Sequence, residues 1–182
     1  EVATFRILGV FIDSPSATST ASHSWDPRRL FVNLLDFSRG DDGIRPGKAP
    51  DGCFYTVLEL AEESLESHLR RRAEESAYIG IAEVQQLAKS LATGLSHLHA
   101  HGLCHLDVKP ANIMRFSTIW KLIDLEGCLF EGADTALKRD CFTPLYACPE
   151  LARAVLALPT GAAGLSQTPL TGVQPSAKMD LW

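Results

Sequence analysis

An Asp, a Lys and an Asn stand at short, fixed spacings in the segment His-Leu-Asp-Val-Lys-Pro-Ala-Asn at residues 105–112. Asp107 can accept or orient the proton of an incoming hydroxyl, and Lys109 can offset the charge of a phosphate. Asn112 offers a neutral oxygen ligand for Mg²⁺, and Asp124 offers a charged one. Phosphoryl transfer needs this set of groups, because its catalysis consists mostly of positioning and charge neutralisation.

A polar turn is the alternative interpretation of this segment. An isolated Asp-x-Lys is more often a solvent-facing turn than a catalytic element. Here Pro110, Asn112 and the later Asp124 follow in order after a short gap. That order favours a functional origin for the segment.

Two predicted helices precede the segment and would position it. Residues 81–101 form the clearer one, because apolar residues recur at helical spacing and Gly102 follows at a natural C-terminal position. Its predicted core-facing stripe is Val84, Leu87, Leu91, Leu95 and Leu98. The other helix starts near Leu65, with Ser64 as its N-cap and with Leu65 and Leu69 on one face.

Two apolar runs rich in β-forming residues, 5–12 and 54–60, are predicted strands. Most of residues 13–52 is rich in Ser, Gly, Pro and Asp, which predicts a surface insertion with a short ordered piece at 30–37. Residues 151–179 are rich in Ala, Gly, Pro, Ser and Thr, which predicts a short helix followed by a second insertion. We expect residues 13–52 and 158–178 to be the least ordered.

The bulk composition fits one globular domain of 182 residues, with 46% hydrophobic and 21% charged residues. The net charge of −5 and the lack of a basic block argue against nucleic acid as a partner. No apolar run is long enough to span a bilayer, and no secretory leader is recognisable. Five cysteines without a Cys-x-x-Cys pair predict reduced thiols in an intracellular, cytoplasmic protein.

A zinc site is the competing interpretation of four histidines within nine residues: His97, His99, His101 and His105. His97 and His101 would share one helix face, whereas His99 points elsewhere. No cysteine pair lies nearby to complete a site. We therefore favour structural roles for these histidines.

The order of these segments resembles the eukaryotic-type protein kinase domain. Lys109-Pro110 and the Thr-Pro-Leu-Tyr run at 143–146 resemble its serine/threonine branch. The Ala-Cys-Pro-Glu run at 147–150 resembles the Ala-Pro-Glu motif. Residues 57–61 resemble the hinge, and residues 179–182 resemble the start of the central helix of the large lobe. The resemblance covers residues 54–182 well and residues 5–12 weakly.

This resemblance implies an α+β, protein-kinase-like fold with a mostly helical large lobe and a remnant of the small-lobe sheet. Residues 1–60 would be the small-lobe remnant, with an insertion at 13–52. Residues 61–182 would be the hinge and a truncated large lobe, with an insertion at about 151–179. The whole chain would be a partial kinase domain.

The resemblance also implies a role for each site residue, with ATP and Mg²⁺ as cofactors and a protein serine or threonine as the phosphate acceptor. Asp107 would be the catalytic Asp, Lys109 would contact phosphate, and Thr143 would support both Asp107 and the substrate hydroxyl. Asn112 and Asp124 would hold the metal. The adenine site would consist of Leu58 as gatekeeper, the backbone of Glu59 and Ala61, and Met114 against the base.

Several departures from the family pattern set further expectations. Leu106 replaces an Arg that commonly pairs with a phosphorylated loop, and Glu126 replaces the Gly of the metal turn, so Gly127 would supply the flexible backbone there. Glu150 would be a buried carboxylate without its usual Arg. No Gly-rich phosphate loop is present, so we expect weak activity at most from this chain alone. The alternative is a pseudokinase-like interaction module that keeps the fold without turnover.

Overall fold

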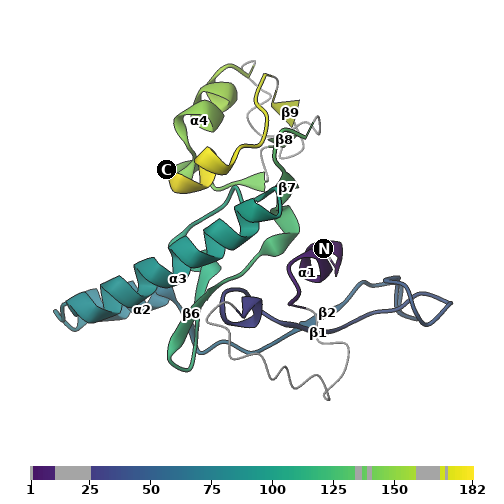
Figure 1. Cartoon of the computed structure of the whole chain (residues 1–182), viewed down its shortest axis with the longest axis horizontal. Coiled ribbons are helices and arrows are strands. Elements are labelled where there is room, and N and C mark those ends of the chain that lie inside the picture. Colours follow the sequence, from purple (N-terminus) through teal and green to yellow (C-terminus); the bar gives the residue numbers. More distant parts are fainter. Residues whose placement is uncertain (1, 11–25, 134–136, 139–140, 159–168, 171) are drawn as a thin grey trace.

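The computed structural model describes residues 2–10, 26–133, 137–138, 141–158, 169–170 and 172–182, and combines helices with small antiparallel sheets (Figure 1). The α-helices are α1 (Val2–Ile7), α2 (Leu65–Glu74), α3 (Ile81–Ala100) and α4 (Pro149–Leu156). The strands are β1 (Leu34–Phe37), β2 (Thr56–Leu58), β3 (Glu63–Ser64), β4 (Leu103–Cys104), β5 (Ile113–Phe116), β6 (Ile119–Leu122), β7 (Leu129–Phe130), β8 (Leu137–Lys138) and β9 (Pro169–Leu170). Short 3₁₀ helices include η1 (Pro27–Arg29), η2 (Pro110–Asn112), η3 (Leu125–Gly127), η5 (Pro144–Tyr146) and η7 (Ala177–Leu181).

Helix α3 is the longest element and matches the predicted helix within one residue. It ends at Ala100 with His101 as its C-cap, and Gly102 follows with a φ of +68°, a backbone conformation that favours glycine. Its predicted apolar stripe is only partly buried. Leu95 and Leu98 are in the core, whereas Val84 is 47% exposed. The periodicity identifies the apolar face but not how much of it neighbouring elements cover.

Helix α2 begins as predicted, because Ser64 and Ser67 form a reciprocal capping box. Of the two leucines predicted to share one face of this helix, Leu65 is buried and Leu69 is 39% exposed. His68 takes the second buried position. Its two ring nitrogens each lie 3.0 Å from a carboxylate, one of Glu63 and one of Glu83 on α3. The contact between Nδ1 and Glu63 is a hydrogen bond, which offsets part of the cost of burying the polar ring.

The central sheet has the order β3-β5-β6, and β5 and β6 form an antiparallel hairpin. Ile113 pairs with Leu122 at the open end of the hairpin. This pairing brings the chain that follows β6 back beside the chain that precedes β5. Residues 112 and 124 therefore lie close together although twelve positions separate them.

The predicted strand at residues 5–12 was wrong over its described part, because Val2–Ile7 is helical. Phe5 and Leu8 are buried one helical turn apart, and Gly9 then reverses the chain with a φ of +69°. The carbonyl of Val10 accepts a hydrogen bond from the amide of Leu34 at 3.1 Å. A short apolar run satisfies either a helix or a strand, so periodicity could not decide between them.

The predicted ordered piece at residues 30–37 belongs to the main core. Leu30, Phe31, Val32 and Leu34 are buried, and β1 pairs with β2. The loop between β1 and β2 is tied together by backbone hydrogen bonds such as Gly47 N to Ser38 O at 3.0 Å. Part of the two predicted insertions, residues 13–25, 159–168 and 171, lies outside the described residues.

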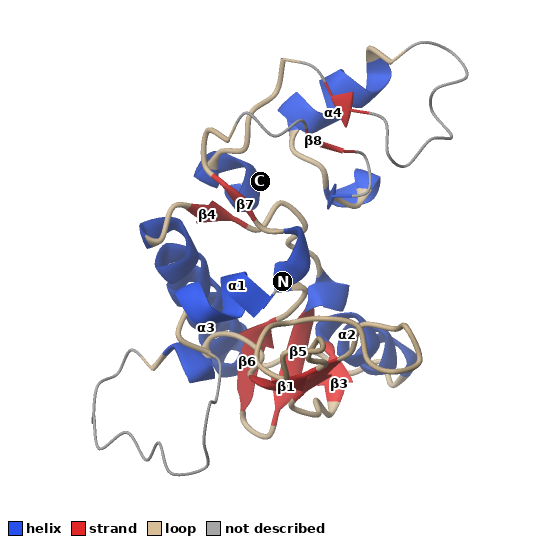
Figure 2. Cartoon of the chain, turned by 90° about the vertical axis from the view of Figure 1, so that its right-hand side faces the viewer, coloured by secondary structure: helices blue, strands red, loops and turns tan. Residues whose placement is uncertain are grey.

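A second, smaller core lies around α4 and the β8-β9 pair, away from the β3-β5-β6 sheet (Figure 2). It joins residues 105–112, called here the catalytic-type segment, to the residues between β8 and β9. Its buried members are Cys104, Leu106, Leu137, Phe142, Cys148, Leu151 and Leu170. The segment at 105–112 is thus fixed between the two cores.

The cysteines provide a chemical test of this packing. Burial raises the pKa of both Cys104 and Cys128 to about 12, whereas Cys53 is exposed. The thiolate is the reactive form, so we expect iodoacetamide near neutral pH to modify Cys53 at least about a thousandfold faster than either buried thiol. Peptide mass spectrometry over time measures these rates. Similar rates for all three in the absence of denaturant would contradict the packing described here.

Candidate functional site

The catalytic-type segment is held by one buried carboxylate. Oδ2 of Asp180 accepts a hydrogen bond from the amide of His105 at 2.8 Å, and Oδ1 accepts one from the amide of Leu106 at 2.6 Å. The ring nitrogen Nε2 of His99 on α3 lies 2.8 Å from the same carboxylate. The side chain of Asp180 is fully buried. The bonds fix Leu106 at a φ of +68°, which a branched residue adopts only when its surroundings impose it.

The imidazole of His105 connects this segment to the acidic turn that begins at Asp124. Its Nε2 lies 2.8 Å from the carbonyl of Ile123, and the ring is 1% exposed. Ile123 directly precedes Asp124 in the sequence. The two loops that carry the predicted site residues are therefore bound to each other through a buried side chain.

Asp107, Lys109 and Thr143 form a closely hydrogen-bonded group. Nζ of Lys109 lies 2.6 Å from Oδ2 of Asp107 and 2.6 Å from Oγ1 of Thr143. The amide of Thr143 donates to Oδ1 of Asp107 at 2.7 Å. Burial acts to raise the pKa of Asp107, but the hydrogen bonds from Lys109 and Thr143 outweigh burial and hold that pKa below its ordinary value. Asp107 is consequently ionised at neutral pH and can accept a hydrogen bond from a hydroxyl.

Asn112 links this group to Asp124. Its Nδ2 donates to the carbonyl of Asp107 at 2.9 Å, and lies 3.2 Å from Oδ2 of Asp107 and 3.4 Å from Oδ2 of Asp124. Asp124 has left-handed backbone angles, with a φ of 63° and a ψ of 49°. The adjacent amide and carboxylate are the hard oxygen donors that Mg²⁺ prefers. The side chains present therefore suit a magnesium ion.

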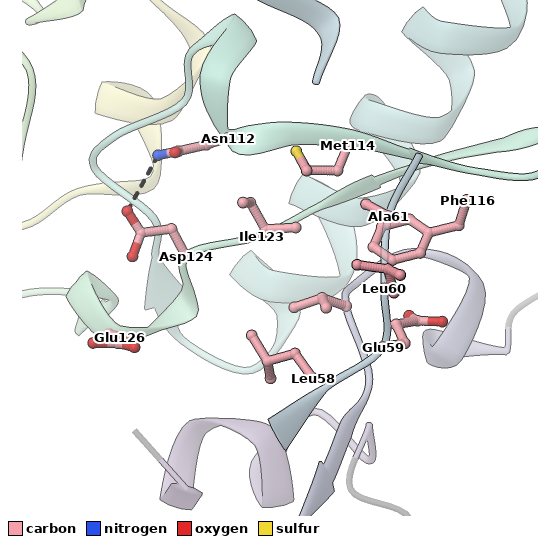
Figure 3. Close-up of a pocket in the computed structure, with 11 residues that line it drawn as sticks. Leu58, Glu59, Leu60, Ala61, Asn112, Met114, Phe116, Ile123, Asp124 and Glu126 are labelled. Carbon is pink, nitrogen blue, oxygen red and sulfur yellow. Dashed lines mark hydrogen bonds between the residues drawn. The ribbon is translucent and has the colours of Figure 1, made fainter. Parts of the chain in front are cut away.

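A cavity of about 410 Å³ opens next to Asn112 and Asp124 (Figure 3). Leu58, Glu59, Ala61 and Met114, the predicted adenine-site residues, line it. Its remaining lining residues are Val32, Leu60, Phe116, Ile123 and Glu126. The structure thus brings all nine predicted site residues to one place. Asp107, Lys109 and Thr143 adjoin the cavity through Asn112 rather than lining it.

The hinge-like segment is anchored through the side chain of Glu59. Its Oε1 accepts hydrogen bonds from the backbone and side-chain amides of Asn33, both at 2.8 Å, and binds the ammonium of Lys121. The amide of Glu59 donates to the carbonyl of Asn33 at 3.1 Å. In the part of the chain that the structure describes, the backbone of Ala61 makes no hydrogen bond. The backbone N–H and C=O of Ala61 can therefore form hydrogen bonds with a flat heterocycle in the cavity.

Two expectations about departures from the family pattern were wrong. The unusual backbone conformation in the acidic turn falls on Asp124, and neither Glu126 nor Gly127 has a positive φ. Glu126 therefore fits the turn without strain, and Gly127 need not supply flexibility. Glu150 is exposed rather than buried, so its carboxylate is hydrated and needs no Arg partner.

The histidines do not assemble into a metal site. Among the described residues, no group of three or more His, Cys, Asp or Glu side chains is arranged to hold a metal ion. The rings of His97 and His101 have centroids 4.5 Å apart and are tilted by 48°. His99 lies against the carboxylate of Asp180, and His105 lies against the carbonyl of Ile123. Structural roles account for His99 and His105.

Several contributors to the site were not predicted from the sequence. They are Asp180 as the anchor of the loop, Lys121 and Asn33 as partners of Glu59, and the lining residues Val32, Phe116, Ile123 and Glu126. The alternation in β5 gave one usable signal, because Met114 and Phe116 share a strand face. The contacts of Asp180 and Lys121 span 75 and 62 positions, which local spacing does not reveal.

The protein kinase domain family model matches residues 48–159, which is more than half of the chain. The chain belongs to the protein kinase family. It is 28% identical over 149 residues to MAP kinase-activated protein kinase 2 of Cricetulus longicaudatus, covering 79% of this chain and 44% of that protein. It is 30% identical over 114 residues to the cell division control protein 2 homolog D of Antirrhinum majus, covering 63% of this chain and 32% of that protein.

This kinase-family chain spans less than half the length of both relatives. The family match includes the hinge-like segment, the catalytic-type loop, the acidic turn and Glu150. It ends before Asp180, the residue that anchors the loop. No helix among the described residues is long and apolar enough to cross a membrane.

Replacing the anchor of the loop should destabilise this kinase fold. Asp180→Ala leaves two buried amides without an acceptor, so the free energy of unfolding should fall by about 3 kcal/mol. Urea unfolding followed by circular dichroism measures this change. Asp41→Ala is the control, because Asp41 is exposed in a turn, and it should change stability by less than about 0.5 kcal/mol. Equal losses in both variants would contradict the anchoring role.

Proposed function

We propose that the protein transfers the γ-phosphate of ATP to serine or threonine hydroxyls of a protein substrate. The observation that carries this proposal is the continuous hydrogen-bonded group formed by Asp107, Lys109, Thr143, Asn112 and Asp124 at the end of an apolar cavity. The group contains a hydroxyl acceptor, a phosphate-neutralising cation and two metal ligands. The cavity has an apolar lining suited to adenine.

Adenine would lie between the hinge-like segment and the β5–β6 hairpin. Leu58, Met114 and Ile123 provide apolar contacts, and the backbone of Glu59 and Ala61 provides polar ones. The bonds from Asn33 and Lys121 hold Glu59 in place before a ligand arrives. Binding therefore costs little reorganisation at the hinge.

The phosphates would extend toward Asn112 and Asp124. Magnesium, when bound there, neutralises phosphate charge and orients the transferring group. Asp107 would hold the acceptor hydroxyl through its ionised carboxylate, and Lys109, which is bound to Asp107 at 2.6 Å, would offset the charge of the transferred phosphate. Thr143 fixes the orientation of Asp107 through its backbone amide. The resemblance of Lys109-Pro110 and residues 143–146 to the serine/threonine branch supports serine and threonine hydroxyls as acceptors.

A pseudokinase-like interaction module is the second candidate. Glu126 is the observation in its favour, because it lines the cavity where the family pattern has glycine and adds negative charge beside the metal ligands. Such a module would bind a ligand in the cavity without turnover. Retention of Asp107, Lys109, Asn112 and Asp124 in one bonded group favours the enzyme.

Substitutions of Asp107 and Asp124 should have different effects on the affinity for nucleotide. Asp107→Asn should change the affinity for Mg²⁺-ADP by less than about twofold, because Asp107 serves the hydroxyl. Asp124→Asn should weaken it by about tenfold or more, because it removes a charged metal ligand. Calorimetric titration measures both affinities. Equal losses would remove the separate roles assigned here.

Turnover should depend on more than this chain. The 182 residues contain no Gly-x-Gly-x-x-Gly loop to orient the phosphates. We therefore expect transfer to a generic Ser/Thr substrate by the purified chain to stay near background in a radiolabel assay. Robust, metal-dependent labelling would contradict this expectation.

Activity of a longer protein containing this domain should resist phosphatase. Leu106 is buried with Leu137 and Phe142, so apolar packing occupies the position from which an Arg would bind a loop phosphate. We expect phosphatase treatment to change its transfer rate by less than about twofold. A large drop after treatment, with a matched mock-treated sample unchanged, would show that a loop phosphate is required.

A further inference from the structure

A cavity of about 330 Å³ lies between α3, η1 with its flanking residues, and the start of β6, and we call it the α3 cavity. None of its lining residues lines the cavity next to Asn112 and Asp124. Its volume is within the range that small ligands occupy in proteins. The α3 cavity is therefore a separate candidate site, which the proposed phosphoryl transfer does not use.

Helix α3 contributes a polar face to the α3 cavity. Its lining residues are Gln86, Lys89, Ser90 and Thr93, whose spacing places them on one side of the helix. Nε2 of Gln86 donates a hydrogen bond to the carbonyl of Thr118 at 2.8 Å, which ties the helix to the β5–β6 turn. The hydroxyls of Ser90 and Thr93 are available as hydrogen-bond donors. This side of the cavity thus offers an ammonium and two hydroxyls to one ligand.

The opposite wall is held by backbone hydrogen bonds. The amide of Arg29 donates to the carbonyl of Asp26 at 2.9 Å, and the carbonyl of Leu30 accepts from the amide of Leu122 on β6 at 2.9 Å. Leu30 and Ile119 form the apolar part of the lining. The cavity therefore combines polar groups with a small apolar surface on a fixed backbone.

The charges of the α3 cavity are unequal. The carboxylate of Asp26 is bound by the guanidinium of Arg28, with distances of 3.0 Å from Nε to Oδ1 and 2.9 Å from Nη2 to Oδ2. Neither Arg29 nor Lys89 forms a salt bridge with any residue that the structure describes. Both cations line the cavity, so it is positively charged in a chain whose net charge is −5.

We infer that the α3 cavity binds a small organic phosphate monoester. Such a group carries a charge of about −1.5 to −2 near neutral pH, which matches two cations better than a carboxylate does. The planar guanidinium of Arg29 suits two phosphate oxygens, and Lys89 supplies a second positive charge. Ser90 and Thr93 donate to the remaining oxygens, and the apolar lining contacts the organic part. The inference is independent of the proposed nucleotide site.

The test is calorimetric titration of the whole chain with phenyl phosphate, inorganic phosphate and phenol in a buffer of low ionic strength. Arg29→Gln and Lys89→Gln each remove one charge, and Thr93→Val removes a hydroxyl at nearly constant size. Lys48→Gln is the matched control, because Lys48 is exposed in the β1–β2 loop and lines neither cavity. Circular dichroism confirms that each variant is folded.

The wild type should bind phenyl phosphate with a dissociation constant of about 1 mM or lower and should not bind phenol measurably. Inorganic phosphate should bind at least about threefold more weakly, because it lacks the apolar contact. Arg29→Gln and Lys89→Gln should each weaken binding of phenyl phosphate by about fivefold or more, and Thr93→Val by about twofold or more. Lys48→Gln should change it by less than about 1.5-fold, because a distant exposed charge is screened.

Several results would overturn the inference. The first is the absence of phenyl phosphate binding to the wild type. The second is unchanged affinity in both Arg29→Gln and Lys89→Gln, which would place the ligand elsewhere. An equal loss in Lys48→Gln would show that only the overall charge matters. Equal affinities for inorganic phosphate and phenyl phosphate would rule out an organic ester as the preferred ligand.

Discussion

The buried carboxylate of Asp180 holds together parts of the chain that are far apart in sequence. It accepts hydrogen bonds from the amides of His105 and Leu106 and lies 2.8 Å from the ring of His99 on α3. A fully buried carboxylate is stable only when such partners replace its hydration. The position of Asp107 follows from this anchor, because Asp107 directly follows the residues that Asp180 holds.

From this fixed point the site is built by two kinds of interaction. Polar contacts pass from Asp107 through Asn112 to Asp124, while His105 ties the loop to Ile123. Apolar packing of Leu106 in the smaller core fixes the opposite side of the loop. Asp107, Asn112 and Asp124 are therefore held in place by contacts within the protein, as the proposed phosphoryl transfer would require.

Short-range patterns predicted which polar residues lie together better than they predicted burial. The order of residues in 105–112 and at Asp124 anticipated the contacts among Asp107, Lys109, Asn112 and Asp124. The Ser64 cap and the long helix followed from local rules. The helix at Val2–Ile7 was missed because a short apolar run has no decisive period. The exposure of Glu150, the burial of His68 and the anchoring by Asp180 depend on tertiary partners that the sequence does not identify.

The proposed function requires that the cavity and the acidic turn form one magnesium–nucleotide site. A crystal structure of the chain with a non-hydrolysable ATP analogue and Mn²⁺, located by its anomalous scattering, would show where both bind. We expect adenine between the backbone of Glu59–Ala61 and the side chain of Met114, with the metal bound to oxygens of Asn112 and Asp124. A nucleotide bound outside this cavity, or a metal that contacts neither residue, would contradict it.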